Sequence, residues 1–271
     1  MDSTLNVILI GILEGLTEFL PISSTGHLII ASSLLSLNGV EVKAFLVVIQ
    51  LGAILAVCWH QKQIIYQTLK ELPKKKSDSF AVKILAAFVP TACIGLVFYD
   101  LVKTFLFSPI SVSLALILGG VLIITVENRN QNSQDTRLEN ITIFQAIKIG
   151  FFQSIAIFPG VSRSGATIIG GLTLGLSRKT ATLFSFLLAI PTMFAATVFD
   201  LAKTPELLTP ESLPALSIGF SVAFITALLT VKLLVSFVSR HSFKPFGYYR
   251  IIFGMAILLT WETGLIDWQP L

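Results

Sequence analysis

Residues 14–27 read EGLTEFLPISSTGH, and this stretch interrupts an apolar run that extends over residues 5–37. It places two glutamates, a proline, three consecutive hydroxyl side chains and a histidine in a segment that is otherwise as apolar as a membrane helix. Each half of the run is shorter than the roughly 20 residues that a helix needs to cross a bilayer. Irregular backbone at membrane depth must be buried in protein or line a cavity. The stretch therefore predicts a re-entrant helical hairpin.

A second apolar run, 145–176, is interrupted in the same way by PGVSRSGAT at residues 159–167. Shifting the first run by 139 residues places Ser23 on Ser162, and the match continues through both breaks without a gap. The chain is therefore predicted to be one membrane domain, 1–271, built from two repeats of about 1–127 and 140–271.

The composition agrees with a membrane protein, because 54% of the 271 residues are hydrophobic and only 13% are charged. An ordinary soluble domain has about 25% charged residues. The apolar runs are continuous, whereas the strands of a membrane barrel would alternate in polarity. We expect an all-α polytopic protein with six transmembrane helices and two re-entrant helical hairpins. The predicted spans are 43–59, 81–101, 110–126, 180–200, 213–237 and 247–263.

Three spans per repeat is an odd number, so the second repeat must enter the membrane from the opposite side, which is an inverted-topology repeat. Loops 60–80 and 238–246 are rich in lysine and arginine, which predicts that they are cytoplasmic. Counting spans from there places both termini outside and lets the first hairpin enter from the outer face. The net charge of +4 is explained by these loops, so we expect the lipid bilayer and no nucleic acid as a partner.

Glu14 and Glu18 are four residues apart, so a helix places both carboxylates on one face. A carboxylate inside a membrane is costly even singly, and two on one face also repel each other. A divalent metal ion between them, or protonation of one, would relieve this repulsion. The alternative is a helix end that reaches interfacial water, which is less favoured because Pro21 and a polar run follow directly.

Ser23, Ser24 and Thr25 supply three hydroxyls, and Gly26 supplies a permissive backbone, at the start of the returning helix. The free N–H groups of a helix N-terminus bind anions such as phosphate. A simple serine or threonine N-cap is the alternative, and the two interpretations are compatible. A lone histidine is usually structural, but His27 lies beside hydroxyls and near carboxylates. It is therefore a candidate general base, acid or nucleophile.

Arg163 is the most informative residue of the second break, because arginine at membrane depth is rare and almost always functional. Its planar guanidinium suits bidentate contact with phosphate. The alternative is an ion pair with one of the two glutamates across the repeat interface, and both roles can hold. Ser162, Ser164, Gly165 and Thr167 surround it with the same hydroxyl-and-glycine chemistry as the first break, so we expect them to bind substrate.

Three other features have a structural alternative. Gln50 stands in the middle of a predicted span, where helix–helix hydrogen bonding is the default explanation, and we retain it as a candidate substrate-binding residue. The pairs Gly119–Gly120 and Gly170–Gly171 permit close helix contact. That contact would lie within one chain or between two copies in a homodimer, and the sequence does not decide between them.

The two motifs EGLTEFLPISSTGH and PGVSRSGAT resemble those of the undecaprenyl-diphosphatase family, also called bacitracin-resistance proteins. The resemblance covers essentially the whole chain, including FLVVIQLGAILAV, FSFLLAIPT and FKPFGYYR. It implies a bacterial inner-membrane phosphatase that converts undecaprenyl diphosphate to the monophosphate and so recycles the lipid carrier of cell-wall synthesis. It also implies dependence on a divalent metal, Mg²⁺ or Ca²⁺.

The resemblance assigns functional roles to Glu14, Glu18, Ser23, Ser24, Thr25, His27, Ser162, Arg163, Ser164 and Thr167. Ser24 or His27 would attack the terminal phosphorus, or His27 would activate a water molecule. A hydroxyl next to a histidine favours Ser24 as nucleophile with His27 as base. The rival hypothesis is a transporter that flips a polyprenyl phosphate, because inverted repeats with broken helices are typical of transporters.

Overall fold

The computed structural model describes residues 3–37, 39–71, 79–105, 108–129, 137–203, 212–266 and 268, and these residues form only helices, turns and connecting segments. The all-α class is therefore confirmed. In chain order the α-helices are α1 (Thr4–Thr17), α2 (Ser24–Leu34), α3 (Val40–His60), α4 (Lys62–Glu71), α5 (Phe80–Phe105), α6 (Pro109–Arg129), α7 (Ile143–Ser154), α8 (Arg163–Thr173), α9 (Arg178–Lys203), α10 (Leu213–Val238) and α11 (Lys244–Glu262). Short 3₁₀ helices cover Leu138–Asn140 and Ile155–Ile157.

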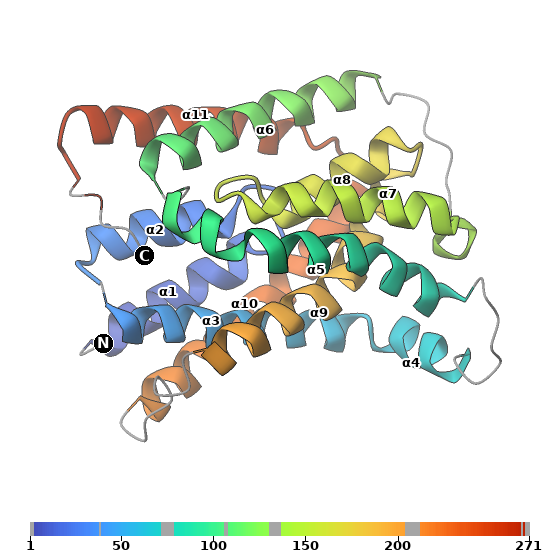
Figure 1. Cartoon of the computed structure of the whole chain (residues 1–271), viewed down its shortest axis with the longest axis horizontal. Coiled ribbons are helices and arrows are strands. Elements are labelled where there is room, and N and C mark those ends of the chain that lie inside the picture. Colours follow the sequence, from blue (N-terminus) through green and yellow to red (C-terminus); the bar gives the residue numbers. More distant parts are fainter. Residues whose placement is uncertain are drawn as a thin grey trace.

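Most helices run along the long axis of the molecule (Figure 1). α1 starts at the left end, the chain breaks near the middle, and α2 returns to the same end. α7 starts at the right end, breaks near the middle, and is followed by α8, which returns to the right. Both interrupted stretches thus form helix–break–helix units, which open toward opposite ends of the molecule.

Among the described residues, five helices are long and apolar enough to cross a membrane: α3, α5, α6, α9 and α10. The sixth predicted span forms α11, a helix of 19 residues that is not in this group. Its apolar character is lowered by Arg250 and by the adjacent Tyr248 and Tyr249. The chain is a multi-pass membrane protein on the evidence of the five apolar helices.

A further helix, α4, occupies part of the predicted loop 60–80. Its 10 residues are too few and too polar to resemble a span, which is why the sequence indicated only a loop there. The ammonium of Lys62, the first residue of α4, lies 4.7 Å from the ring centroid of Trp59 on α3. Lys74, Lys75 and Lys76, which contribute to the predicted cytoplasmic charge, lie outside the described residues.

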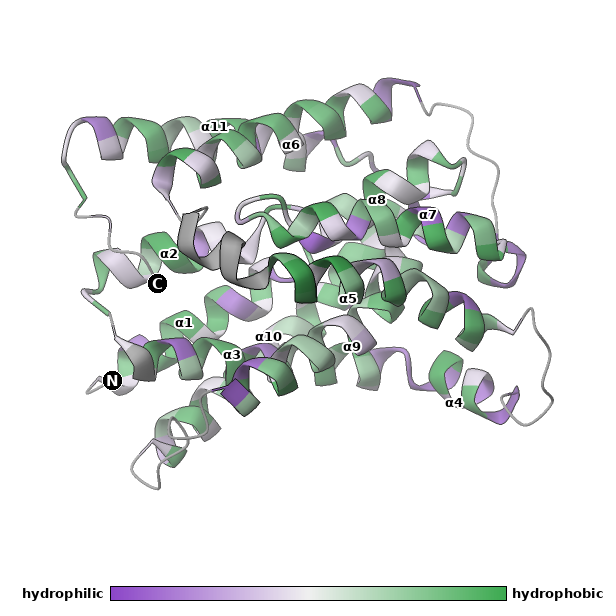
Figure 2. Cartoon of the chain, viewed as in Figure 1, coloured by the Kyte–Doolittle hydropathy of each residue, from purple (hydrophilic) through white to green (hydrophobic). Residues whose placement is uncertain are grey.

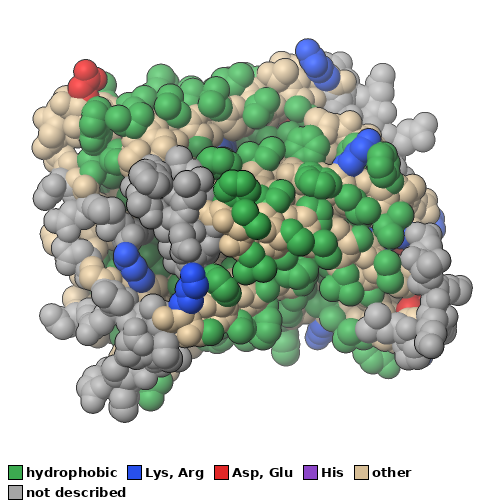
Figure 3. Space-filling view, in the orientation of Figure 1, with side chains coloured by type: hydrophobic (Ala, Val, Ile, Leu, Met, Phe, Trp, Pro, Cys, Tyr) green, Lys and Arg blue, Asp and Glu red, His purple; other side chains and the backbone are tan. Residues whose placement is uncertain are grey.

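The distribution of polarity is that of a membrane protein. Hydrophobic side chains spread across the middle of the face in Figure 3, and the ribbons in Figure 2 are apolar along most of their length. Leu96, Leu118, Leu233 and Leu259 are among many large apolar side chains that are more than half exposed. Several charged side chains lie instead in the interior. Lipid would cover the outer apolar surface, and the buried polar groups require internal partners.

The backbones of the two breaks correspond at the offset found in the sequence. Ser23 and Ser162 have φ values of 69° and 70°, and Ser36 and Gly175, which end the returning helices, have 53° and 84°. The amide of Leu37 donates to the Ser32 carbonyl at 2.8 Å, and that of Leu176 to the Gly171 carbonyl at 3.0 Å. The internal sequence similarity is therefore accompanied by similar local structure.

Both pairs of adjacent glycines pack within the chain. A Cβ atom at Gly120 would lie 2.6 Å from the Gly247 carbonyl oxygen on α11, and one at Gly170 would lie 2.7 Å from the ring of Phe152 on α7. A Cβ atom at Gly119 would overlap the guanidinium of Arg250. These glycines bring α6 close to α11 and α7 close to α8, so they give no support to a dimer interface.

Candidate active site

The two breaks begin with residues that cannot continue a helix. Pro21 lacks an N–H, and Pro159 is followed by Gly160 at φ 90°. Each break ends at a serine with positive φ, Ser23 or Ser162, a conformation that costs energy for a residue with a side chain. Such strain occurs mostly at functional sites, where the surrounding structure enforces it.

An ion pair joins the two breaks. Arg163, the first residue of α8, donates from Nη2 to Glu18 Oε1, just beyond α1, at 3.0 Å. Nη1 donates to the Ser185 carbonyl at 3.2 Å, and Nη2 also contacts Met193 Sδ at 3.0 Å. The guanidinium lies 5.4 Å from the ring centroid of Phe19. The pairing that was the alternative role for Arg163 is therefore present in the structure.

Ser24 and His27 do not form the pair that the sequence favoured. The Ser24 hydroxyl donates to Glu18 Oε2, so Glu18 contacts Ser24 through one oxygen and Arg163 through the other. His27 instead contacts the Ser23 carbonyl through Nδ1 at 2.7 Å and the Tyr249 hydroxyl through Nε2 at 2.6 Å. The approach of α11 to α2 decides this orientation, and spacing within α2 gives no information about it.

Glu14 lies one turn before Glu18, as predicted, and is only 1% exposed. The amide of Glu18 donates to the Glu14 carbonyl at 3.0 Å, so both residues belong to the same helical turn. Within the described residues, Glu14 Oε1 and Arg163 Nε are buried and have no hydrogen-bond partner. Each such atom costs free energy unless a ligand or water satisfies it.

The hydroxyls of the second break have partners within the protein. Ser162 caps α8 by accepting from the Gly165 amide at 3.1 Å, and Ser164 donates to the Leu20 carbonyl at 2.8 Å. Thr167 donates to the Ser185 hydroxyl at 2.6 Å. All these side chains are buried, so in this state they connect the second break to its surroundings.

The remaining predicted residues differ in their distance from this cluster. Ser23 is the N-cap of α2 but forms no side-chain cap bond, and Thr25 and Gly26 follow it in the first turn. The α2 N-terminus therefore lacks the serine cap that α8 has. Gln50 lies on α3, and within the described chain no hydrogen bond connects it to Glu18 or Arg163.

Arg250 is a central residue that the sequence analysis missed. Its side chain on α11 is fully buried, with 0% exposure, and its five N–H groups all face backbone carbonyls. The acceptors are the carbonyls of Pro21, Ala115, Leu116, Gly160 and Val161, at 2.9–3.2 Å. Arg250 thus satisfies carbonyls of both breaks at once. An arginine inside an apolar run was the available signal, the same signal that identified Arg163.

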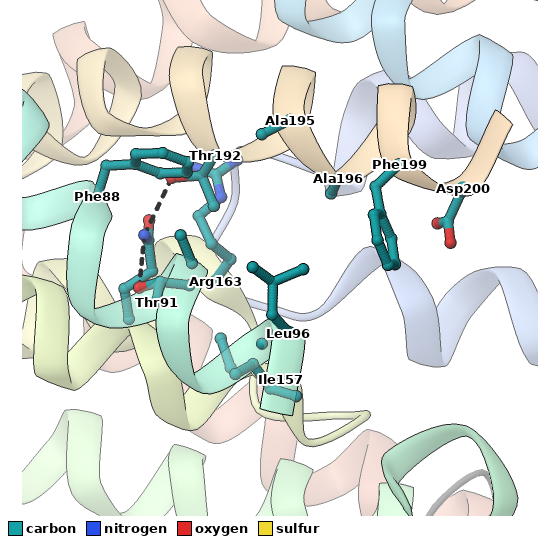
Figure 4. A pocket seen from close by; sticks show the side chains of 14 residues that line it. Phe88, Thr91, Leu96, Ile157, Arg163, Thr192, Ala195, Ala196, Phe199 and Asp200 are labelled. Atoms are coloured by element: carbon teal, nitrogen blue, oxygen red, sulfur yellow. Dashed lines mark hydrogen bonds between the residues drawn. The ribbon is translucent and has the colours of Figure 1, made fainter. Parts of the chain in front are cut away.

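A cavity of about 490 Å³ adjoins the ion pair between α5, the end of α7 and α9 (Figure 4). Arg163, Thr91 and Thr192 lie at one end of it, and Phe199 and Asp200 lie at the other. The buried Gln153 donates to both threonine hydroxyls at 3.0 Å. The other lining residues are apolar or small, among them Phe88, Ala92, Leu96, Ile157, Ala195 and Ala196. The cavity therefore has apolar walls between a polar end at Arg163 and the carboxylate of Asp200 at the opposite end.

The residues present fit a hard divalent cation in part. Two carboxylates, one with an orphaned buried oxygen, and the Ser24 hydroxyl are oxygen donors of the kind that Mg²⁺ and Ca²⁺ prefer. No group of three or more histidine, cysteine, aspartate or glutamate side chains that could hold a metal occurs in the described part of the chain. A cation here would need further ligands from substrate phosphates and water, as Mg²⁺ sites commonly do.

Comparison with known proteins identifies relatives over nearly the full length. A protein of Ectopseudomonas mendocina named undecaprenyl-diphosphatase is 49% identical over 263 residues, 97% of this chain and 95% of the relative. The protein of that name from Nitrosomonas europaea is 47% identical over 265 residues, 98% of this chain and 97% of the relative. Residues 7–256 match the family described as bacitracin resistance protein BacA. The chain is therefore a member of the BacA family.

Proposed function

We propose that this protein is an integral membrane phosphatase that hydrolyses undecaprenyl diphosphate to undecaprenyl monophosphate and phosphate. Its family and the names of its relatives support this activity. The observation that supports this activity most directly is that Glu18 contacts both Ser24 and Arg163. These contacts join a nucleophile, a proton acceptor and a cation across two strained breaks.

Phosphoryl transfer depends mainly on positioning and on neutralising charge. The terminal phosphate would lie against the α2 N-terminus and Arg163, whose unpartnered Nε is one available donor. Ser24 Oγ attacks the terminal phosphorus, and its proton passes to Glu18 Oε2. The bond between that phosphorus and the bridging oxygen breaks, and its electron pair leaves with undecaprenyl monophosphate.

Water then hydrolyses the phosphoserine. Glu18 first passes the proton taken from Ser24 to the departing monophosphate, which leaves its carboxylate free again. It then accepts a proton from the attacking water, the Ser24–phosphorus bond breaks, and Glu18 returns this proton to the Ser24 oxygen. Glu14 and Glu18 are the residues that would hold a divalent metal. Such a metal would neutralise charge on the phosphate oxygens. The structure leads us to prefer Glu18 over His27 as the group that accepts the Ser24 proton, because Glu18 is the residue in contact with it.

The cavity between α5 and α9 fits the other half of this substrate. A polyprenyl diphosphate has a charged head and a long apolar tail. The polar end of the cavity contains Arg163, and its apolar walls extend toward Phe199. We assign the first isoprene units of the tail to these walls, while the rest of the tail would extend into lipid.

For the placement in the membrane we propose six spans, with α11 as the sixth, and two re-entrant hairpins related as an inverted repeat in one domain. The opposite directions of the hairpins and the matching φ values at Ser23 and Ser162 support the repeat. The basic residues of α4 and of the α10–α11 connection support a cytoplasmic right end in Figure 1. Both termini and the opening of the first hairpin are then outside a bacterial inner membrane.

Phosphate release by the purified protein in detergent tests the activity. We expect wild-type protein to release phosphate from undecaprenyl diphosphate and Ser24→Ala to release almost none. Ser33→Ala is a matched control, because this hydroxyl on the same helix has no partner within the described residues. Equal rates of phosphate release by the wild type and by Ser24→Ala would contradict the proposal.

The second candidate function is transfer of a polyprenyl phosphate between leaflets, which the opposed hairpins favour. Detergent offers no second compartment, so release there supports an enzyme. Lipid transfer in proteoliposomes without any release in detergent would support a carrier instead.

A further inference from the structure

We propose that Tyr249 is a positioning residue of this reaction, which acts by holding the His27 ring in one orientation. The inference rests on the proposed phosphatase function. Tyr249 lies in the stretch FKPFGYYR, but no sequence motif indicated its contact with His27, because 222 residues separate the two side chains.

The hydrogen bonds define the tautomer of His27. Nδ1 lies 2.7 Å from the Ser23 carbonyl oxygen, which can only accept, so Nδ1 carries the proton. Nε2 of the neutral ring is then an acceptor, and it lies 2.6 Å from the Tyr249 hydroxyl. The tyrosine therefore donates to Nε2, and the two bonds together hold the ring in one orientation.

Aromatic packing holds the ring in the same orientation. The His27 ring stacks on Phe253 with centroids 4.2 Å apart and on Tyr249 with centroids 5.6 Å apart. Tyr249 and Phe253 are four residues apart on α11, so one helix face supplies both contacts. His27 is only 6% exposed, and rotation of its ring would break both hydrogen bonds.

The position of His27 affects Ser24, the proposed nucleophile, through the backbone between them. Its Nδ1–H bond holds the carbonyl of Ser23, the residue with the unfavourable positive φ. That carbonyl belongs to the peptide bond that leads into Ser24, whose hydroxyl contacts Glu18. The path from Tyr249 through His27 to the Ser23 carbonyl therefore orients the nucleophile.

Arg250 fixes α11, the helix that carries Tyr249, against both breaks. Arg250, the next residue on α11, bonds to the Pro21 and Val161 carbonyls in the two breaks at 3.2 and 2.9 Å. α11 is thereby attached to the same segments that carry Ser23 and Arg163. Tyr249 is held at a defined distance from His27 by its neighbour and not only by its own hydroxyl.

Tyr249→Phe tests the proposal, because it removes one hydroxyl and keeps the stacked ring. Tyr248→Phe is the matched control, since Tyr248 is 56% exposed and no contact with His27 is found for it in the described chain. The loss of one hydrogen bond should lower kcat about 3- to 10-fold in Tyr249→Phe, with KM near the wild-type value. Tyr248→Phe should match wild type. Equal kcat values for the two variants would overturn the proposal.

A double-mutant cycle separates positioning from simple stabilisation. In a His27→Asn background, Tyr249→Phe should cause no further loss of kcat, because the tyrosine acts through the histidine. A loss as large as in wild type would show a structural role and overturn the proposal.

Nitrogen NMR of the imidazole provides a readout that does not depend on catalysis. Wild type and Tyr249→Phe should both show the His27 tautomer protonated at Nδ1, because the Ser23 carbonyl sets it. The Nε2 signal should shift in Tyr249→Phe, because that nitrogen loses its hydrogen bond. An unchanged signal in Tyr249→Phe overturns the proposed action on His27. If the wild-type protein releases no phosphate, the phosphatase function fails, and this measurement still decides whether Tyr249 holds the ring.

Discussion

At the scale of single residues, the buried Arg250 and the partly buried Arg163 have different partners and therefore different roles. Arg250 is satisfied by five backbone carbonyls and has no free N–H for a ligand. Arg163 pairs with Glu18 but retains an unpartnered Nε at the edge of a cavity. Five hydrogen bonds to backbone carbonyls thus offset the cost of burying the Arg250 cation, while Arg163 keeps a donor for a phosphate.

Arg163→Lys tests this distinction, because lysine keeps the charge and loses the planar fork. If Arg163 contacts the diphosphate in the transition state, kcat should fall about 10²–10³-fold. Steady-state kinetics compare the kcat of Arg163→Lys with that of Arg240→Lys. The second variant is the control, because Arg240 is exposed. A folded lysine variant with nearly full turnover would leave Arg163 with only its ion pair.

The two glutamates should respond differently to loss of charge. Glu14→Gln should raise the metal concentration needed for half-maximal rate, because Glu14 has an orphaned oxygen, whereas Glu18 is the glutamate that contacts Ser24. Glu18→Gln should also lower the rate at saturating metal, because it removes the Ser24 proton acceptor and the Arg163 partner. Titration of activity with Mg²⁺ and Ca²⁺ measures both effects. An unchanged titration midpoint in Glu14→Gln would remove this residue from the metal site.

At the scale of elements, α11 joins the two breaks and the helix that carries His27. It packs against α6 at glycines, and the Arg250 guanidinium lies where a side chain at Gly119 would be. This contact explains why a helix with an arginine in its apolar segment is nevertheless a well-packed element.

Gly119→Ala should therefore destabilise the protein by about 1–3 kcal/mol, the usual range for overpacking a core. Gly95→Ala is the matched helical control, because its Cβ would meet Ile157 at an ordinary 3.8 Å. Thermal unfolding in detergent should show a lower midpoint for the first variant only. Equal midpoints would mean that α6 and α11 adjust without cost.

The sequence predicted the elements better than it predicted the contacts between them. Apolar runs gave the long helices, and Pro21 and the Pro159–Gly160 pair gave both breaks, because these signals are local. α4 was missed because a helix of 10 mixed residues has no length signal. The Ser24–Glu18 contact depends on the backbone path through the break, where Ser23 has positive φ. The His27–Tyr249 contact depends on how α11 approaches α2, which no spacing within one motif encodes.

At the scale of the whole molecule, the two hairpins and the distribution of basic residues predict the sidedness. Single cysteines can be introduced at Ser3, the N-cap of α1, and at Gln67, on α4, after replacement of Cys58 and Cys93. The start of α1 lies at the left end of the molecule in Figure 1, and α4 lies at the right end. An impermeant thiol reagent added to intact cells should label the first and spare the second. The reverse pattern would contradict the proposed orientation.

The central claim is that the two breaks form a single diphosphate site. An experimental structure with a non-cleavable methylene-diphosphonate analogue of the polyprenyl substrate tests it most directly. The account predicts the terminal phosphonate between Ser24 and Arg163, at the α2 N-terminus, with the first isoprene units in the cavity beside Phe88 and Phe199. A diphosphonate bound away from both breaks, in contact with neither Ser24 nor Arg163, would contradict it.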